Sequence, residues 1–465
     1  MSKYLMIDFG STFTKLTAVD TEVEDIIGTA SHFTTVSTDI TIGYHNALKA
    51  LYAKLGGEVK FDKIISCSSA AGGLKMCAIG LIEELTVEAA KRVCLGAGAK
   101  VDLVFSHHIN KKEVAKITEM GIDIILLAGG TDGGNEECVL YNARMLGEGG
   151  IKIPIIYAGN KSCSDEIEDI FKEFGMDGYI CENVMPQINV LNLPSARDKI
   201  REIFLKNIIV AKGIKKIESE IDKVILPTPE AVLNACNLLS KGYMHERGLG
   251  ELVALDIGGA TTDVYSMCSA SAKRSDVVLK GLEEPYAKRT VEGDLGMRYS
   301  ALGVLKALTE EEIRMINEDE HVDMEKELYL RHNNVDIVYK EDKREEYVDL
   351  LIGGICADKG MARHVGKLEE IYSPLGTMYA QIGKDLSQIE YVIGTGGILV
   401  NSKNPVKIME KVKGDMHKYL ELRPQHPTFL LDADYIFAAM GLLSEENPLL
   451  ALKIMKKHLK EVELK

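Results

Sequence analysis

The chain has 465 residues, enough for two or three domains, and its 46% apolar and 27% charged residues are typical of a globular protein. The net charge of −15 argues against a nucleic-acid-binding protein, which normally presents a basic face. Because there is no long apolar run and the nine cysteines are scattered without a Cys-x-x-Cys pair, we expect neither a membrane span nor a signal peptide, and a reduced, cytoplasmic protein.

The first stretch with a chemical signal is residues 4–19, YLMIDFGSTFTKLTAV. An apolar run ends at Asp8, a small-residue turn follows and β-branched residues resume, which predicts a hairpin with its tip at the turn. Glycine lets backbone N–H groups approach an anion, and hydroxyl side chains add donors. The candidate phosphate ligands here are Gly10, Ser11, Thr12, Thr14 and Lys15. For Lys15, a solvated strand lysine is an equal alternative, because lysines are usually exposed.

The next segments complete a first half-domain. Residues 26–30 and 63–66 are predicted strands, and residues 44–55 have the spacing of a helix that ends at two glycines. The loop CSSAAGG at 67–73 is either a plain turn, which we favour, or a loop that lines a cleft.

From about residue 100 to residue 193 the pattern changes to short strands that alternate with helices. This predicts a small parallel α/β domain of βαβ units, inserted over residues 100–195. The predicted strands are 101–106, 122–127, 154–157 and 179–182, and the predicted helices are 111–120, a segment after 127, and 165–174.

Two features of this inserted segment are candidate ligand sites. The loop AGGTDGGN at 128–135 places glycines and Asp132 at the carboxyl end of a strand, where open α/β sheets bind ligands. A glycine-rich turn that caps the next helix explains the loop equally well. His107 and His108 are neighbours on a strand and would point to opposite faces, so we interpret them as structural residues.

Residues 252–267, LVALDIGGATTDVYSM, repeat the pattern of the first hairpin, with Asp256 in the place of Asp8. The candidate phosphate ligands of this second turn are Gly258, Gly259, Thr261 and Thr262. Asp8, Asp256 and Asp263 cannot face phosphate bare, so we expect a divalent cation with its water shell between them. Two such hairpins on either side of a cleft would hold a nucleoside triphosphate by its tail, a reading we favour over ordinary hairpins because the pattern is repeated.

Three later segments predict two helices and a strand that ends in a glycine turn. Residues 227–239 predict a helix with Glu230 near its start, and residues 434–442 predict a helix with small residues at a close helix crossing. Residues 391–400, YVIGTGGILV, predict a strand that runs into a glycine turn. The glycines of that turn are Gly394, Gly396 and Gly397, which the resemblance described below implies as nucleotide ligands.

The remaining segments predict helices. Residues 305–351 are dense in charge, which indicates solvated helices, and residues 448–465 predict an amphipathic lysine-rich helix. A helix predicted over 353–368 carries basic residues every four positions, which would form a stripe on one face. These residues are Lys359, Arg363 and Lys367.

The two hairpins, the glycine turn and the two helices resemble, in this order, the phosphate, adenosine and connecting-helix motifs of the superfamily of acetate and sugar kinases, heat-shock-70 proteins and actin. Within it, IDFGSTFTK at the start, LLAGGTDGGN at 126–135 and RTVEGDLGMR at 289–298 resemble the MutL family of accessory proteins of adenosylcobalamin-dependent glutamate mutase. That family is unrelated to the mismatch-repair protein of the same name.

The resemblance implies an α/β fold with two actin-like, ribonuclease-H-like ATPase domains around a nucleotide cleft. Domain I would comprise residues 1–100 and 195–245, the inserted domain residues 100–195, and domain II residues 246–465. It also implies ATP or ADP with Mg²⁺ as cofactors and places Asp8, Asp256 and Asp263 at the metal. Glu230 lies where heat-shock-70-type members carry a carboxylate near the attacking water.

The function that the resemblance implies is a slow ATPase that drives release of damaged cobalamin from a mutase, gripped by the inserted domain. The cobalamin-binding signature Asp-x-His-x-x-Gly is absent, so we expect no cobalamin bound by that motif. A small-molecule kinase and a non-catalytic nucleotide-binding protein are the alternatives. No substrate-binding constellation for a sugar or an acid is visible, which counts against the kinase. The oligomeric state is open, a homodimer included.

Overall fold

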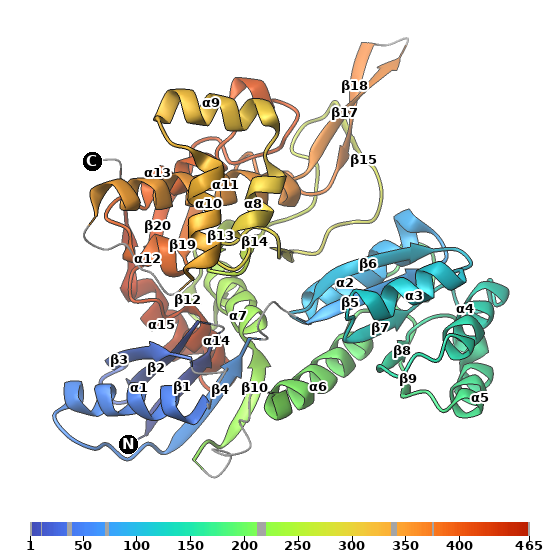
Figure 1. The fold of residues 1–465 in the computed structure, drawn as a ribbon, viewed down its shortest axis with the longest axis horizontal. Helices are drawn as coiled ribbons and strands as arrows, with labels where there is room; N and C mark the ends of the chain where they lie inside the picture. Colours follow the sequence, from blue (N-terminus) through green and yellow to red (C-terminus); the bar gives the residue numbers. More distant parts are fainter. Residues whose placement is uncertain are drawn as a thin grey trace. The chain divides into compact units, whose positions relative to one another are not determined.

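The computed structural model describes residues 2–10, 12–34, 40–69, 74–211, 220–335, 342–373 and 376–463. The chain divides into two compact units (Figure 1). Unit 1 comprises Met1–Gly72, Lys212–Lys280 and Glu284–Lys465, and unit 2 comprises Gly73–Ala211 with Gly281–Glu283. Among the described residues, no helix combines the length and the apolar character needed to cross a bilayer.

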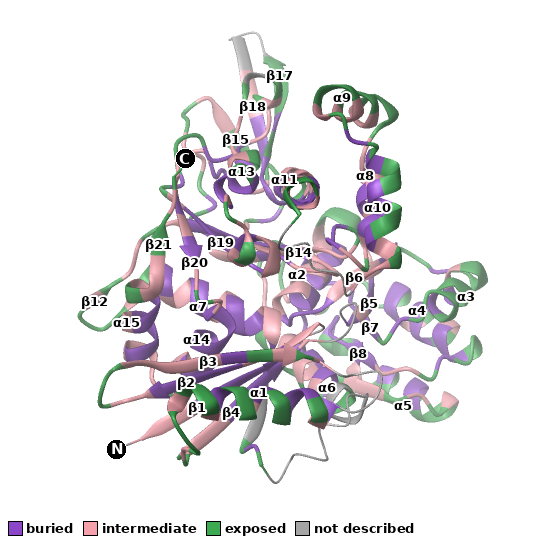
Figure 2. Ribbon diagram, turned by 60° about the vertical axis from the view of Figure 1, so that its left-hand side comes forward, coloured by how far each residue is buried: buried purple, intermediate pink, exposed green. Residues whose placement is uncertain are grey.

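The first sheet of unit 1 has the strand order β10-β4-β1-β2-β3. Strands β1, β2 and β3 form an antiparallel meander, and β4 and β10 continue the sheet in parallel with β1. Helix α1 packs on β2 and β3. The inner strands are buried while the outer side of α1 is exposed (Figure 2). The elements are β1 (Lys3–Phe9), β2 (Phe13–Asp20), β3 (Asp25–Phe33), α1 (Ile40–Leu55), β4 (Lys63–Ser68) and β10 (Lys223–Pro227).

The second sheet repeats this topology, in the order β16-β14-β13-β19-β20-β21. Again three antiparallel strands are followed by two parallel ones. The repeat seen in the two hairpin sequences is therefore a repeat of the topology of a whole half-domain. The elements are β13 (Leu252–Ile257), β14 (Thr262–Met267), β16 (Ala287–Glu292), β19 (Tyr391–Thr395), α12 (Gly397–Asn401), β20 (Thr428–Asp432) and β21 (Leu459–Glu461). The duplicated meander with its parallel extension is the predicted actin-like α/β architecture.

Three helices share one apolar cluster with strands of both sheets: α7 (Thr228–Lys241), α14 (Phe437–Ser444) and α15 (Pro448–His458). A Cβ at Gly441 of α14 would lie 1.8 Å from the Ala231 carbonyl oxygen of α7, which confirms the predicted close crossing of two small-residue helices. The C-terminal segment is not one helix over residues 448–465, which corrects the prediction from the sequence. It leaves α15 and adds β21 to the edge of the sheet, where β21 completes the hydrogen bonding of β20.

The long connection between β16 and β19 forms four helices and part of a small sheet of order β15-β18-β17. The helices are α8 (Ala301–Ala307), α9 (Glu310–Glu320), α10 (Met324–Asn333) and α11 (Lys343–His364). The strands of the small sheet are β17 (Lys367–Ser373) and β18 (Gly376–Ile382) from this connection, and β15 (Val277–Leu279), which precedes β16 in the chain. The predicted basic stripe does not exist as drawn: Lys367 begins β17, Lys359 pairs with Glu312, and Arg363 pairs with Asp294. The remaining short elements of this unit are β11 (Gly242–Tyr243), β12 (Glu246–Arg247), α13 (Val406–Met409) and the helical turns Glu410–Val412 and Met416–Lys418.

Unit 2 is a five-stranded parallel sheet of order β6-β5-β7-β8-β9 with helices between the strands. Its range is wider than the expected 100–195, because β5 pairs with both β6 and β7 and so belongs to this sheet. The elements are β5 (Lys75–Gly80), α2 (Glu88–Gly96) after a π-helical turn (Glu83–Val87), β6 (Lys100–Ser106), α3 (Lys111–Glu119), β7 (Ile124–Leu127), α4 (Glu137–Glu148), β8 (Ile155–Tyr157), a 3₁₀ turn (Lys161–Cys163), α5 (Ser164–Phe174), β9 (Gly178–Ile180) and α6 (Pro194–Ala211).

Candidate functional site

The two hairpin tips of unit 1 lie against each other. Each tip is closed by one backbone hydrogen bond, from Gly10 N to Phe13 O at 3.1 Å and from Gly258 N to Thr261 O at 2.9 Å. A Cβ at Gly259 would lie 3.6 Å from the Thr12 hydroxyl oxygen. The fold therefore brings together the two glycine turns that the sequence predicted on either side of a nucleotide.

The hydroxyl groups of the tips differ in where they point. Thr14 shares a hydrogen bond with Thr34, and Thr262 donates to the Leu295 carbonyl, so both hydroxyls are used inside the fold. Thr261 donates to Asp263. In the first tip, the Thr12 hydroxyl lies toward the second tip. Ser11 lies outside the described residues.

Asp8 is a buried carboxylate at the end of β1, 4% exposed. Its Oδ1 accepts a hydrogen bond from the Thr228 hydroxyl at 2.7 Å, and the Cys67 thiol lies 3.6 Å away. Its Oδ2 lies 2.8 Å from Lys15 Nζ and forms an ion pair with it. Asp8 thus ties the first residue of α7 to the hairpin and keeps lone pairs for a further ligand.

Lys15 joins the two halves of the unit. Its ammonium pairs with Asp8 and lies 3.6 Å from the centre of the Tyr435 ring. Burial alone would lower the pKa of Lys15, but the combined attraction of Asp8, Tyr435 and Asp256 raises it. Burial also raises the pKa of Tyr435 to about 12. Lys15 is therefore a fixed cation at the cleft and not the solvated strand lysine of the alternative interpretation.

The second tip has two carboxylates in register across its hairpin, Asp256 and Asp263. Asp263 forms a buried ion pair with Arg289, 2.7 Å from Arg289 Nη2 and 2.8 Å from its Nε. Burial and the nearby charge of Asp263 raise the pKa of Asp256 to about 7, against the opposing attraction of Lys15. A carboxylate with such a pKa, in a partly exposed position, can accept or release a proton near neutrality.

The duplication makes the chemistry of the two tips comparable position by position. Lys15 is the register partner of Asp8, and Asp263 is the register partner of Asp256. The first tip therefore contains its own counter-ion, whereas the second takes one from Arg289 on the neighbouring strand.

The predicted glycine turn lies beside Asp256. A Cβ at Gly396, whose φ is +93°, would lie 2.5 Å from the Asp256 Oδ1, and a Cβ at Gly397 would meet nothing within 4 Å. Gly394 is packed against Met409 within β19. The turn thus combines one glycine required by close approach to a carboxylate with one that leaves room for a ligand.

Glu230 lies in the first turn of α7 and is buried, 3% exposed. It follows Thr228, the residue that donates to Asp8, by two positions. The structure therefore places the predicted water-positioning carboxylate on the helix that Asp8 holds.

No group of three or more histidine, cysteine, aspartate or glutamate side chains among the described residues forms a metal cage. Magnesium does not need one, since it is usually held by one or two carboxylates together with phosphate oxygens and water. The carboxylates of Asp8 and of the partly exposed Asp256 fit such a site. Asp263 is already paired with Arg289, so it would lie outside the group of direct metal ligands.

Sequence reasoning missed several residues of this site. Asp432, at the end of β20, accepts hydrogen bonds from Thr395 and from the backbone at the start of α14, and burial raises its pKa. An apolar run that ends in aspartate marks it, as it marks Asp8 and Asp256. Tyr435 and Arg289 lie in quoted motifs, but their sequence contexts do not reveal which charges they face.

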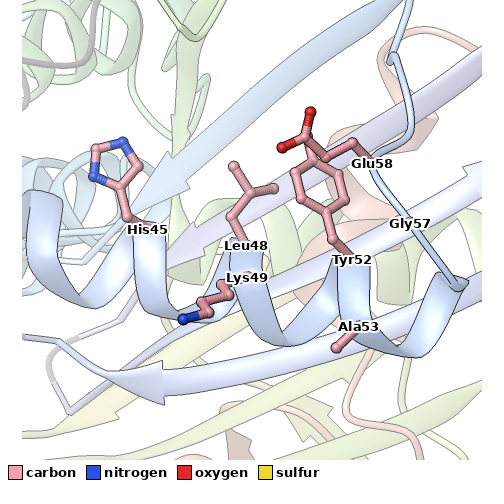
Figure 3. Close-up of a pocket in the computed structure, with 7 residues that line it drawn as sticks. All are labelled: His45, Leu48, Lys49, Tyr52, Ala53, Gly57 and Glu58. Atoms are coloured by element: carbon pink, nitrogen blue, oxygen red, sulfur yellow. The ribbon is translucent and has the colours of Figure 1, made fainter.

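A surface hollow on the outer side of α1 is separate from these residues (Figure 3). Its lining contains neither a glycine turn nor a pair of carboxylates, so it has none of the features that suit a nucleotide tail. The lining residues are His45, Leu48, Lys49, Tyr52, Ala53, Gly57 and Glu58.

The fold and the paired tips define this chain as a protein of the actin-like ATPase and kinase class. Residues 4–459 match the model of a protein family described as MutL protein. "Protein MutL" of Clostridium tetanomorphum is 50% identical over 463 residues, which cover 99% of this chain and 100% of that protein. The chain therefore belongs to the MutL protein family, the family that its motifs resemble.

Solved structures match only distantly. A glycerol dehydratase reactivase is 10% identical with a TM-score of 0.34, over 95% of this chain and 99% of that one. Component A of the (R)-2-hydroxyglutaryl-CoA dehydratase of Acidaminococcus fermentans is 10% identical with a TM-score of 0.30, over 98% and 99%. Likenesses of this size carry no argument about this chain.

Proposed function

We propose that this protein is an ATP-driven reactivating factor for an adenosylcobalamin-dependent mutase, with glutamate mutase as its partner, and that it works in the cytoplasm. The observation that supports the nucleotide site is the contact between the two glycine tips, with Asp8 and Asp256 behind them. Membership of the MutL family supports the mutase as partner. The nine cysteines are all free thiols, which suits a reducing compartment.

In this proposal the backbone of Gly10, Gly258 and Gly259, with the Thr12 hydroxyl, binds the phosphate tail of ATP. The turn that carries Gly396 and Gly397 makes room for the adenosine. Both assignments rest on glycines that follow the ends of strands, where an added Cβ would either meet open space or come close to a neighbouring atom.

Asp8 and Asp256 would hold Mg²⁺ through its water shell, and Asp263 would support them from its pair with Arg289. Bound there, the metal ion supplies positive charge next to the phosphate tail. Lys15 adds a fixed positive charge from the first tip, once a phosphate competes with Asp8 for it.

Glu230 and Asp256 would orient the attacking water, and the raised pKa of Asp256 suits it to take up the proton. Because Glu230 lies on α7, the group that positions the water also belongs to a connecting helix.

Hydrolysis would change the structure through the two connecting helices. Asp8 holds the start of α7 through Thr228, and Asp432 caps the start of α14. The two helices cross at Gly441 with no room for a methyl group, so a shift of one start must move both. Loss of the γ-phosphate contacts would therefore shift the two helices, and this shift would change the conformation that holds the mutase.

Glutamate mutase that carries damaged cobalamin tests the proposal. It is incubated with this protein, Mg-ATP and fresh adenosylcobalamin, and recovered mutase activity is measured. We expect recovery with ATP, none with a non-hydrolysable analogue, and none with Asp8→Ala. Glu22→Gln is the matched control, because Glu22 is an exposed acid beyond the far end of the same hairpin. Absence of recovery, together with ATP consumption that appears only with an added small metabolite, would identify a kinase instead.

A further inference from the structure

The sheet of unit 2 has the strand order that in other open α/β domains opens a ligand crevice. Numbered along the unit, its strands lie in the order 2-1-3-4-5, so the connections after β5 and β7 leave from the point where the order reverses. The loop AGGTDGGN, residues 128–135, follows β7 at this point. A ligand of the unit would be expected between these two connections.

The crevice is closed by the protein itself. A Cβ at Gly129 would lie 3.4 Å from Leu81 N and 3.0 Å from a methyl group of Val139, so the connections after β5 and β7 are in contact. A Cβ at Gly130 would lie 2.3 Å from the Asn135 carbonyl oxygen, which means that the loop folds back on itself.

Two buried asparagines, Asn160 and Asn183, hold the loop at 128–135 in place through hydrogen bonds. Asn160 accepts from Gly133 N at 2.9 Å and donates to two carbonyl groups of the loop. Asn183 donates to Asp132 at 2.9 Å and to the Gly130 carbonyl at 3.1 Å. Their exposed fractions are 0% and 4%. Such satisfied buried networks rigidify a loop, so this one is preformed.

The same network holds a short hairpin beside the loop. Asp132 N donates to the Pro186 carbonyl, and the chain then turns at Asn189, where Gln187 and Val190 are bridged. The hairpin exposes Ile188 to 68% and Val190 to 48% of their surface. Large aliphatic side chains are thus displayed on a rigid base at the carboxyl edge of the sheet.

The surroundings of these aliphatic side chains are acidic. The exposed acids of the connections at this edge are Glu83, Glu84, Glu136, Glu137 and Glu182. Lys161 lies 3.9 Å from Asp132 on the connection after β8, and the exposed Lys111 and Lys112 lie at the start of α3, which follows β6 at the opposite end of the sheet from β9. An apolar centre inside a charged rim is the usual anatomy of a protein interface, and the sign of the rim selects the partner.

We propose that the carboxyl edge of unit 2, formed by residues 81–84, 130–137 and 182–192, is the surface that docks the mutase. The matching surface of the mutase has an apolar centre that receives Ile188 and Val190, and a rim rich in lysine and arginine. The proposal rests on the proposed function, because that function supplies the partner. The loop AGGTDGGN then serves as the rigid base of an interface and not as a small-molecule site.

The test measures binding of glutamate mutase to the full chain by titration calorimetry, next to the reactivation assay. Ile188→Asp combined with Val190→Asp should weaken binding on the order of tenfold or more, since both replace the apolar centre. Glu136→Lys combined with Glu137→Lys should weaken binding less and reduce its dependence on salt. All variants should keep the far-UV circular dichroism and the basal ATPase rate of the wild type.

Met120→Asp is the matched control. Met120 is 39% exposed in the same unit but lies before β7, at the amino edge of the sheet. If the wild type binds and reactivates the mutase and the Ile188 and Val190 variant binds it equally well, the proposed docking surface is refuted and the proposed function is not. An equal loss with Met120→Asp also refutes the docking surface. Failure of the wild type to bind or reactivate the mutase refutes the proposed function itself.

Discussion

The buried pair of Arg289 and Asp263 gives a prediction with a defined magnitude. Arg289→Met leaves the Asp263 carboxylate without a cation, where the two side chains are only 3% and 8% exposed. At 2.7 Å and an effective dielectric constant of about 20, the lost attraction is about 6 kcal/mol. The desolvation of arginine that is no longer required offsets part of this, so we expect a net loss of about 3–5 kcal/mol.

Arg289→Met combined with Asp263→Asn should recover most of that loss, because no unpaired charge then remains buried. The chain has no tryptophan and two compact units, so hydrogen exchange of peptides from β14 and β16 is a better measure than a single unfolding curve. A loss under about 1 kcal/mol in the single variant, or a double variant as unstable as Arg289→Met, would refute this reasoning.

Three further predictions concern the rest of unit 1. Gly441→Ala should destabilise the unit by about 1–3 kcal/mol, measured by hydrogen exchange of peptides from α7 and α14, because the new methyl group meets the backbone of α7. Gly396→Ala should lower the melting temperature, because its methyl group strikes Asp256, whereas Gly397→Ala should leave the melting temperature unchanged and weaken binding of a fluorescent ATP analogue, because its methyl group fills only the space left for the ligand. His458 lies 2.7 Å from Asp434 and 2.8 Å from Asp25, and although burial lowers its pKa, the hydrogen bonds with these two carboxylates raise the pKa overall. His458→Gln should therefore lower the melting temperature most below the unfolded-state pKa of about 6.5, and the difference should shrink as pH rises through the raised pKa; a difference that grows with pH would contradict it.

Much of the site could be predicted because its signals are local. Glycine turns at strand ends and small residues on a helix report close approach by themselves, as Gly10 and Gly441 show. The family assignment drawn from these motifs is confirmed by the match over residues 4–459. The hairpins, the connecting helices and the duplicated α/β fold follow from the same local patterns.

Other features depend on partners that are distant in the sequence. The segment 75–80 is too short to show a period, and only its pairing with β6 and β7 makes β5 one of the inner strands of unit 2. Arg289 reaches Asp263 from the neighbouring strand β16, 26 residues further along the chain, and Lys15 meets Tyr435 from the far end of the chain. The short β21 reads as the end of a lysine-rich helix until the free edge of β20 is known.

On the proposed function, the charges at the two tips also restrict the form in which a nucleotide can enter. The carboxylates Asp8, Asp256 and Asp263 outnumber the cations Lys15 and Arg289, and each of these cations is already paired. The carboxylates would therefore repel a polyphosphate without its metal ion, whereas the metal complex brings the missing positive charge with it. On the proposed function, the cleft selects the metal complex over the free nucleotide before any catalytic step begins.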